Sequence, residues 1–172
     1  MKNSTRVIFF FFWLFQAALL LGQDAEIVGF WKSMSDSTGK PESIIAVYEY
    51  QNRYYGRIIL TYDDTGKIED TLYAPKNRAP GVKGQPFYAG MDILWNLNKS
   101  GQKYKNGEII DPEKGRIYGA ELWRDGKDLV VRGEFLFFGR NAKWPPAKEE
   151  DFPPDFKKPD LNKLTPVIPR VK

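Results

Sequence analysis

The sequence predicts an antiparallel all-β fold, a barrel or a sandwich, on three observations. Between residues 27 and 144, apolar residues come in short runs rich in Val, Ile, Tyr, Phe and Trp, separated by Gly, Asp, Asn and Pro. No long window holds the apolar period of a helix. The dipeptide Asp125-Gly126, between two such runs, is a strong hairpin signal. The expected strands occupy residues 27–34, 43–50, 53–62, 91–97, 107–110, 115–123 and 128–138.

The first 22 residues have the layout of a secretory signal peptide. Lys2 and Arg6 precede an apolar run over residues 7–21, after which the chain turns polar. This run is shorter than the roughly 20 residues that a membrane-spanning helix needs. We therefore expect cleavage of residues 1–22, no stable membrane span afterwards, and a protein exported to the periplasm or the extracellular space.

Composition narrows the chemistry that the chain can perform. Between Asp24 and Trp144 there are 18 basic and 17 acidic residues, so the charge gives no sign of a nucleic-acid partner. The chain has no Cys and no His, which excludes thiolate nucleophiles, Ser/His triads and the usual zinc sites. We expect no cofactor, no metal site and no enzymatic activity.

The chain divides into one barrel domain, residues 24–144, and a tail, residues 145–172. Within the domain, prolines and glycines in residues 66–90 predict a long loop with at most one short element. Seven of the 28 tail residues are proline, which removes backbone donors and predicts an extended, largely unstructured segment. Two alternatives are a tail that binds a proline-reading partner, and one that docks on the barrel through Phe152, Phe156, Leu161 and Ile168.

The hairpin at Asp125-Gly126 fixes which residues share a face. A two-residue type I′ turn there places Leu122 opposite Leu129 and Ala120 opposite Val131. Because side chains alternate along a strand, the residues divide into two sets. The predicted inner face holds Tyr118, Ala120, Leu122, Leu129, Val131 and Phe135. The outer face holds Ile117, Glu121, Val130, Arg132 and Glu134.

Residues 106–115 are predicted to form two turns with one short strand between them. Asp111-Pro112-Glu113-Lys114-Gly115 has Pro in the second position, Asp before it to accept backbone hydrogen bonds, and Gly at the end. Asp111 therefore has a structural role. Asn106-Gly107 predicts another turn, which leaves residues 107–110 as a strand paired with residues 116–123.

Gly29-Phe30-Trp31 resembles the Gly-x-Trp signature near the start of lipocalin-type barrels. In those barrels the tryptophan plugs the closed end, and an arginine from the last strands lies over its ring. The resemblance implies a structural role for Trp31, with Arg132 or Arg140 as its cation–π partner.

The chain as a whole resembles the exported bacterial family known as domain of unknown function 2147. The resemblance rests on GFWKS, PFYAGMDILWNL, NGEIIDPEKGRIYGAELW and LVVRGEFLFFGRNAKW. The order of Gly107, Asp111-Pro112, Gly115, Tyr118, Arg132-Gly133 and Trp144 carries most of its specificity. It implies a lipocalin-like barrel and export, and it assigns no catalytic residue. The chain departs from the family in lacking the cysteines of some members and in its proline-rich tail.

Our leading hypothesis is an exported, non-enzymatic barrel that binds a small, partly apolar ligand in its interior or mouth. Barrels of about eight strands hold one such molecule, oriented by a few polar groups. The expected wall residues are Tyr118, Val131 and Phe135, with Trp95 near an entrance.

Two alternatives belong to other classes of protein. The first is a cell-envelope interaction module whose barrel is filled with side chains and whose tail or rim meets a protein partner of unknown identity. The second is a hydrolase that uses Glu108, Asp111 or Glu134. Glu108 lies in a strand and Asp111 in a turn, and nothing in the sequence places both on one substrate bond.

Overall fold

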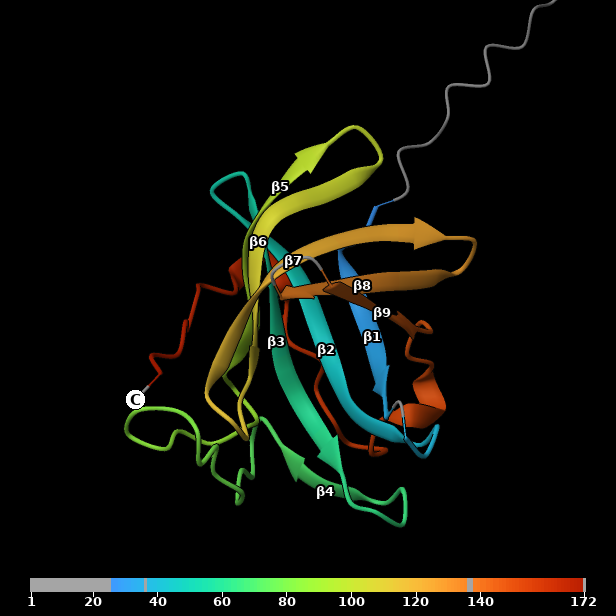
Figure 1. Cartoon of the computed structure of the whole chain (residues 1–172). Coiled ribbons are helices and arrows are strands. Elements are labelled where there is room, and N and C mark those ends of the chain that lie inside the picture. The colour runs from blue at the N-terminus through green and yellow to red at the C-terminus, as the bar shows by residue number, and fades with distance from the viewer. Residues whose placement is uncertain (1–25, 36, 136–137, 172) are drawn as a thin grey trace, which may run out of the picture.

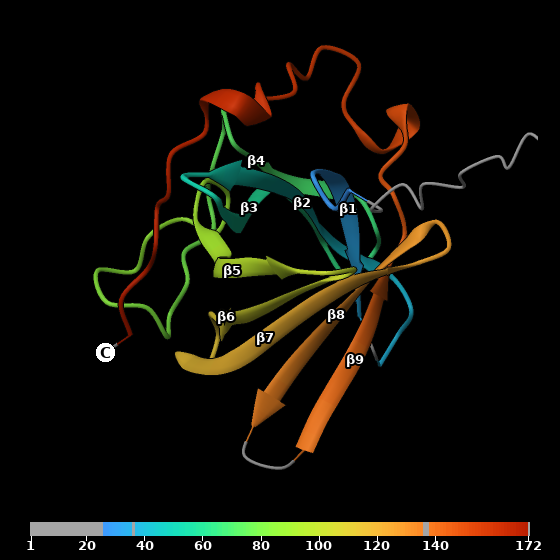
Figure 2. The same cartoon turned by 90° about the horizontal axis from the view of Figure 1, so that it is seen from above.

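The structure, a computed structural model, describes residues 26–35, 37–135 and 138–171, with the side chains of 135 and 138 left out, and forms an antiparallel β-barrel (Figure 1, Figure 2). The predicted signal peptide lies outside these residues. No helix within them is long and apolar enough to cross a bilayer. The elements are β1 (Gly29–Met34), β2 (Pro41–Tyr50), β3 (Arg53–Tyr62), β4 (Ile68–Thr71), β5 (Asp92–Ser100), β6 (Lys103–Asp111), β7 (Arg116–Asp125), β8 (Asp128–Phe135), β9 (Phe138–Trp144), and the 3₁₀ turns η1 (Glu149–Asp151) and η2 (Leu161–Lys163).

The strands follow one another around the barrel, which confirms the predicted fold class. Their order is β1-β2-β3-β5-β6-β7-β8-β9, and the short β4 pairs with the end of β3. The barrel closes through the segment that follows β9. Lys32 N donates to Pro145 O at 2.9 Å, and Ala147 N donates to Phe30 O at 2.9 Å. The last strand therefore reaches β1 through residues 145–147.

The β7–β8 hairpin has the predicted faces with a different turn. Ala120, Leu122, Leu129 and Val131 are all buried. Leu122 pairs with Val131 rather than with Leu129, and the loop residues are Gly126-Lys127. Gly126 has a φ of 60° and Lys127 is not among the positive-φ residues, so the turn requires glycine only at its first central position, as type II′ does. The pairing is displaced by two residues, which keeps each side chain on its predicted face.

The predicted turn at Asn106-Gly107 is wrong, because these residues form a bulge inside β6. Asn106 has a φ of 57°, and the register shifts between Tyr104 and Gly107. A Cβ on Gly107 would lie 2.3 Å from Leu97 Cγ and 2.8 Å from Trp95 O. Asn106 thus adopts the backbone conformation of a bulge, and Gly107 leaves room for the close approach of β5.

The tail, residues 145–171, runs along the outside of the barrel, first over β2 and β3 and then past the start of β5 and the loop between β4 and β5 (Figure 2). Its regular structure is limited to η1 and η2, but Phe152, Phe156 and Leu161 pack on the barrel as the docking alternative expected. Ile168, the fourth residue of that alternative, is exposed. Phe152 is buried in a second apolar cluster with Ile44, Ala46, Ile59 and Leu60. Phe156, Leu161 and Leu164 pack against this cluster. The outer face of these strands is therefore also a core.

A buried polar cluster fastens the tail beside the second core. Asp92 is fully buried and accepts from Arg57 Nε at 2.9 Å and from Tyr48 Oη at 3.0 Å. Its other contacts reach the tail, since Val167 N donates to Asp92 Oδ2 at 2.5 Å. Arg57 Nη2 donates to Thr165 O at 2.5 Å. One buried ion pair thus holds two backbone groups of the tail.

Trp31 lies near the end of the barrel that bears the β7–β8 turn, and its cation–π partner is Arg124. The Trp31 indole is 3% exposed and donates to Ile27 O at 2.8 Å. The Arg124 guanidinium carbon lies 4.7 Å from the ring centroid. The prediction of Arg132 or Arg140 is corrected, because Arg132 points outward and pairs with Glu134 at 2.7 Å.

We expect Arg124→Leu to lower the free energy of unfolding by about 1–2 kcal/mol. The variant loses the contact with Trp31 and the hydrogen bonds from Arg124 to the carbonyls of Glu26, Gly126 and Lys127. Urea unfolding followed by tryptophan fluorescence measures the change. Arg132→Leu is the matched control and removes the solvent-accessible pair with Glu134 and a long hydrogen bond to Asn141, together worth less than about 1 kcal/mol. Equal losses in the two variants would contradict the role of Arg124.

Candidate functional site

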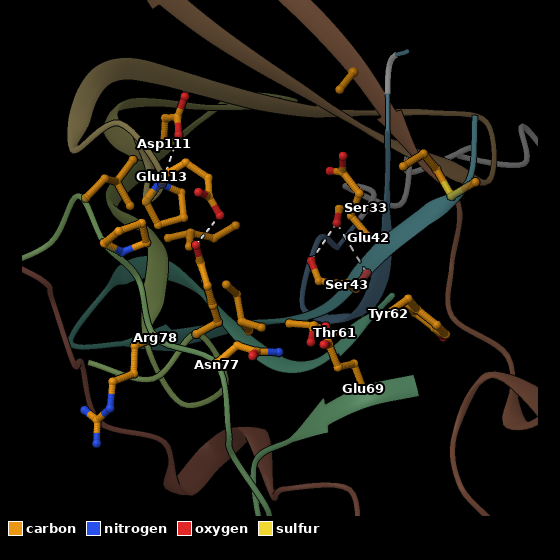
Figure 3. Close-up of a pocket in the computed structure, with 18 of the residues that line it drawn as sticks. Ser33, Glu42, Ser43, Thr61, Tyr62, Glu69, Asn77, Arg78, Asp111 and Glu113 are labelled. Atoms are coloured by element: carbon orange, nitrogen blue, oxygen red, sulfur yellow. Dashed lines mark hydrogen bonds between the residues drawn. The ribbon is translucent and has the colours of Figure 1, made fainter. Parts of the chain in front are cut away.

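A cavity of about 830 Å³ lies at the end of the barrel where β1, β3 and β6 finish, away from the β7–β8 turn (Figure 3). β1 to β6 and β9 all contribute side chains to it, together with the loop between β4 and β5 and the β6–β7 turn. Its size falls within the range of pockets that hold one small organic molecule. Its lining divides into walls of different chemistry.

The wall formed by β1, β2 and β3 carries a row of hydroxyl groups. Ser33 pairs with Ser43, and Ser43 pairs with Thr61, so the three side chains follow one another across the strands. Ser33 Oγ and Ser43 Oγ are 2.6 Å apart, and both residues are 7% exposed. Thr61 Oγ1 is buried and has no hydrogen-bond partner among the described residues. Glu42 and Glu69 line the same wall.

The remaining strands give the cavity an apolar wall. Ile93 of β5 and Ile110 of β6 are buried, as is Trp144 at the end of β9. Ala142 of β9 and Ile58 of β3 complete this side. Alternate residues of a strand face the barrel interior, and the side chains of this apolar wall are among these inward-facing residues. A bound molecule would meet aliphatic groups and an indole here.

Two chain segments meet at the rim of the cavity. Gly81 N, in the loop between β4 and β5, donates to Pro112 O of the β6–β7 turn at 3.0 Å. Tyr88 Oη donates to the Glu113 carboxylate in the same turn. Burial raises the pKa of Tyr88 well above its ordinary value, and the Glu113 hydrogen bond raises it further. The phenol therefore remains a donor that joins the two segments.

Tyr62 is the other phenol of the cavity, and it connects this site with the tail. Its hydroxyl donates to Asp151 O at 3.0 Å. Burial, followed by the nearby Asp151 carboxylate, raises the pKa of Tyr62 to about 12. Its side chain is therefore neutral at physiological pH, so the charges of the cavity come from its carboxylates and Arg78.

Three of the four predicted ligand-binding residues lie elsewhere in the barrel. Val131 is buried in the main core between its cross-strand neighbours on β7 and β9, and Tyr118 is half-buried opposite Ile109. Trp95 is buried, and its Nε1 donates to Glu108. None of these three lines the cavity. The side chain of Phe135 lies outside the described part of the chain.

The three carboxylates considered for hydrolysis have separate structural partners. Glu108 accepts from Trp95 Nε1, and Glu134 pairs with Arg132. Asp111 Oδ1 accepts from two backbone amides of its own turn at 3.1 Å, and Asp111 alone of the three lines the cavity. Within the described ranges, no group of three or more His, Cys, Asp or Glu residues is placed to hold a metal ion.

The hydroxyl row is the part of the site that sequence reasoning missed. Ser33, Ser43 and Thr61 each lie near an end of an apolar strand, at positions that read as ordinary strand boundaries. Their alignment depends on the pairing of three strands and on a register shift between Ile44 and Ile45. The alternation of polar and apolar residues within one strand carries no such information.

Comparison with known structures supports the barrel assignment. The fold is similar to a structure titled "Protein HP1028 from the human pathogen Helicobacter pylori belongs to the lipocalin family", with a TM-score of 0.56. The two chains are 19% identical, and the match covers 73% of this chain and 86% of the other. At this identity the likeness establishes a lipocalin-like fold alone. Among curated proteins, no sequence matches this chain.

The family comparison agrees with the resemblance in the sequence. A family model described as "Uncharacterized protein conserved in bacteria (DUF2147)" matches residues 29–145. The match begins with β1 and ends one residue beyond β9, so it spans the barrel strands and omits the tail. It covers more than half of the chain, and the protein therefore belongs to the DUF2147 family.

Proposed function

We propose that this protein is a non-enzymatic binding protein that holds a small, partly apolar ligand in the cavity at the end of its barrel. The cavity of about 830 Å³ is the observation that supports this function over a barrel filled with side chains. Its aliphatic wall and its few polar groups have the composition of a small-molecule pocket. The ligand site is thus built on Ile58, Ile93, Ile110, Ala142 and Trp144, facing the hydroxyl row.

The amino-terminal segment supports a role outside the cytoplasm, because it has the charge and apolar layout of an exported protein. We propose that the protein is exported and acts in the periplasm or outside the cell.

We expect the neutral fluorescent probe N-phenyl-1-naphthylamine to bind the purified protein with enhanced emission, and Ala142→Trp to weaken that binding at least about tenfold. Ala142 lines the cavity, so an indole at this position occupies the space that the probe needs. Fluorescence titration measures both dissociation constants.

Asn141→Trp is the matched control for this experiment. It adds the same ring to the same strand at an exposed position that does not line the cavity, and we expect unchanged probe binding. Equal affinity in the Ala142 and Asn141 variants would place the probe elsewhere. A wild-type protein that binds no apolar probe, and that releases no small molecule on denaturation, would overturn the proposed function.

A further inference from the structure

From the two walls of the cavity we propose that the ligand is an amphiphile with a positively charged, hydrogen-donating head group, such as an alkylammonium. This inference rests on the proposed function and adds the chemistry of the ligand. The apolar wall sets the place of the hydrocarbon part. The wall formed by β1 to β4 sets the place of the head group.

The head-group wall offers hydrogen-bond acceptors that the protein itself leaves unused. Thr61 Oγ1 is buried at the cavity and lacks a partner among the described residues. A buried hydroxyl without a partner is costly, and a ligand donor that reaches it removes this cost. Ser33 and Ser43 both line the cavity, Ser33 Oγ contacts Ser43 Oγ and Ser43 O, and a hydroxyl oxygen can accept a further hydrogen bond beyond these contacts. The row thus accepts donors from a bound molecule.

Two carboxylates flank this row and determine the preferred charge. Figure 3 shows Glu42, Ser43, Thr61 and Glu69 in that order along the wall. Within the described residues, the side chains of Glu42 and Glu69 form no hydrogen bond and no ion pair. Both residues are exposed at the mouth, so their attraction for a cation is screened by water but remains available.

The other charged groups of the cavity are engaged elsewhere. Arg78 Nη1 donates to Gln85 O at 2.9 Å, and its guanidinium carbon lies 4.1 Å from the Phe87 ring centroid. Figure 3 shows the Arg78 side chain pointing away from the hydroxyl row. Asp111 binds the amides of its turn and Lys114 Nζ, at 3.3 Å. Glu113 accepts from Tyr88. Arg78 keeps its positive charge but points away from the hydroxyl row, so the charged side chains beside the row are the carboxylates of Glu42 and Glu69.

The test uses three decyl compounds that differ only in the head group: decylammonium, decanol and decanoate. Each is titrated at neutral pH, below its micelle concentration, against N-phenyl-1-naphthylamine bound to the full chain. We expect decylammonium to displace the probe at a concentration about fivefold to tenfold lower than decanol, with decanoate weakest, because two exposed carboxylates give a modest attraction. The preference should shrink in 0.5 M salt.

The double variant Glu42→Gln/Glu69→Gln assigns the preference to these side chains. We expect decylammonium and decanol to bind it with equal affinity, and decanol to bind as tightly as to the wild type. Glu150→Gln, a change in the tail outside the cavity, is the control and should keep the full preference. A preference for decylammonium that survives in the double variant would contradict the assignment.

Thr61→Val tests the hydroxyl row independently of charge. Valine has nearly the shape of threonine, and we expect decylammonium and decanol both to lose about threefold in affinity, because a neutral hydrogen bond contributes modestly. Unchanged affinity for both would show that the head group does not reach Thr61. Equal binding of all three decyl compounds to the wild type overturns this inference and leaves the proposed function standing. Failure of all three, together with the probe, removes both.

Discussion

Replacing Asp92 with asparagine is expected to lower the free energy of unfolding by about 3–5 kcal/mol. The carboxylate is fully buried and is the charge partner of Arg57, which is itself 7% exposed. Asparagine leaves the guanidinium without a counter-charge. It also turns one carboxylate oxygen into an NH₂ group, which faces donors from Arg57, Tyr48 or the Val167 amide. The variant therefore loses the ion pair and gains opposed donors.

Urea unfolding followed by tryptophan fluorescence measures this loss, with Asp125→Asn as the control. Asp125 makes a surface ion pair with Lys143 at 2.7 Å, and its removal should leave the free energy of unfolding close to the wild-type value. Tyr48→Phe removes one hydroxyl from the Asp92 cluster and keeps the fold testable if the asparagine variant is too unstable to purify. We expect it to lose about 1–2 kcal/mol. Wild-type stability in both cluster variants would show that the cluster does not hold the fold.

Gly81→Ala is expected to separate the two segments at the rim of the cavity, with a loss of about 1–3 kcal/mol of stability. A Cβ at Gly81 would lie 2.1 Å from Gly115 N and 2.8 Å from Glu113 O. Both are backbone atoms, which cannot rotate away as a side chain can. The loop must therefore withdraw from the β6–β7 turn, and the hydrogen bond from Gly81 N to Pro112 O is lost. We expect weaker binding of N-phenyl-1-naphthylamine as well.

Gly119→Ala is the matched control for the rim. A Cβ there meets the nearest atom, Glu134 Cβ, at 3.8 Å, which is an ordinary contact. Thermal unfolding and probe titration should show Gly119→Ala close to the wild type and Gly81→Ala impaired in both. If Gly81→Ala retains full stability and probe affinity, the contact between the loop and the turn is not needed for the cavity.

Strand periodicity predicted the antiparallel all-β class because it is a local property of the sequence, whereas the choice of a barrel over a sandwich came from the family resemblance. Alternation along residues 116–135 assigned Ala120, Leu122, Leu129 and Val131 to the inner face, and the observed pairing keeps them there although its register differs by two residues. The position of the turn was harder to predict from the sequence. Whether Asp125-Gly126 or Gly126-Lys127 forms the loop depends on backbone angles that a dipeptide signal does not determine.

The candidate site was beyond sequence reasoning because it depends on contacts between distant segments. The hydroxyl row needs the pairing of β1, β2 and β3, and the rim needs Gly81 against the turn that follows Asp111. Arg124 was missed as the partner of Trp31 for the same reason. Any of the arginines at positions 124, 132 and 140 could be the cation–π partner of Trp31 as far as residue type is concerned. Only the closed barrel shows that Arg124 lies over the indole.

The closing contacts between β1 and residues 145–147 bear on how the protein should be produced for experiments. A recombinant fragment cut at residue 145, where the family match ends, would lack Ala147 and its bond to the first strand. It would also expose Ile44, Ala46, Ile59 and Leu60 to solvent. An apolar sheet surface exposed in this way promotes aggregation. Expression trials of such a trimmed version should give insoluble material, whereas a clone that runs to residue 172 should stay in solution.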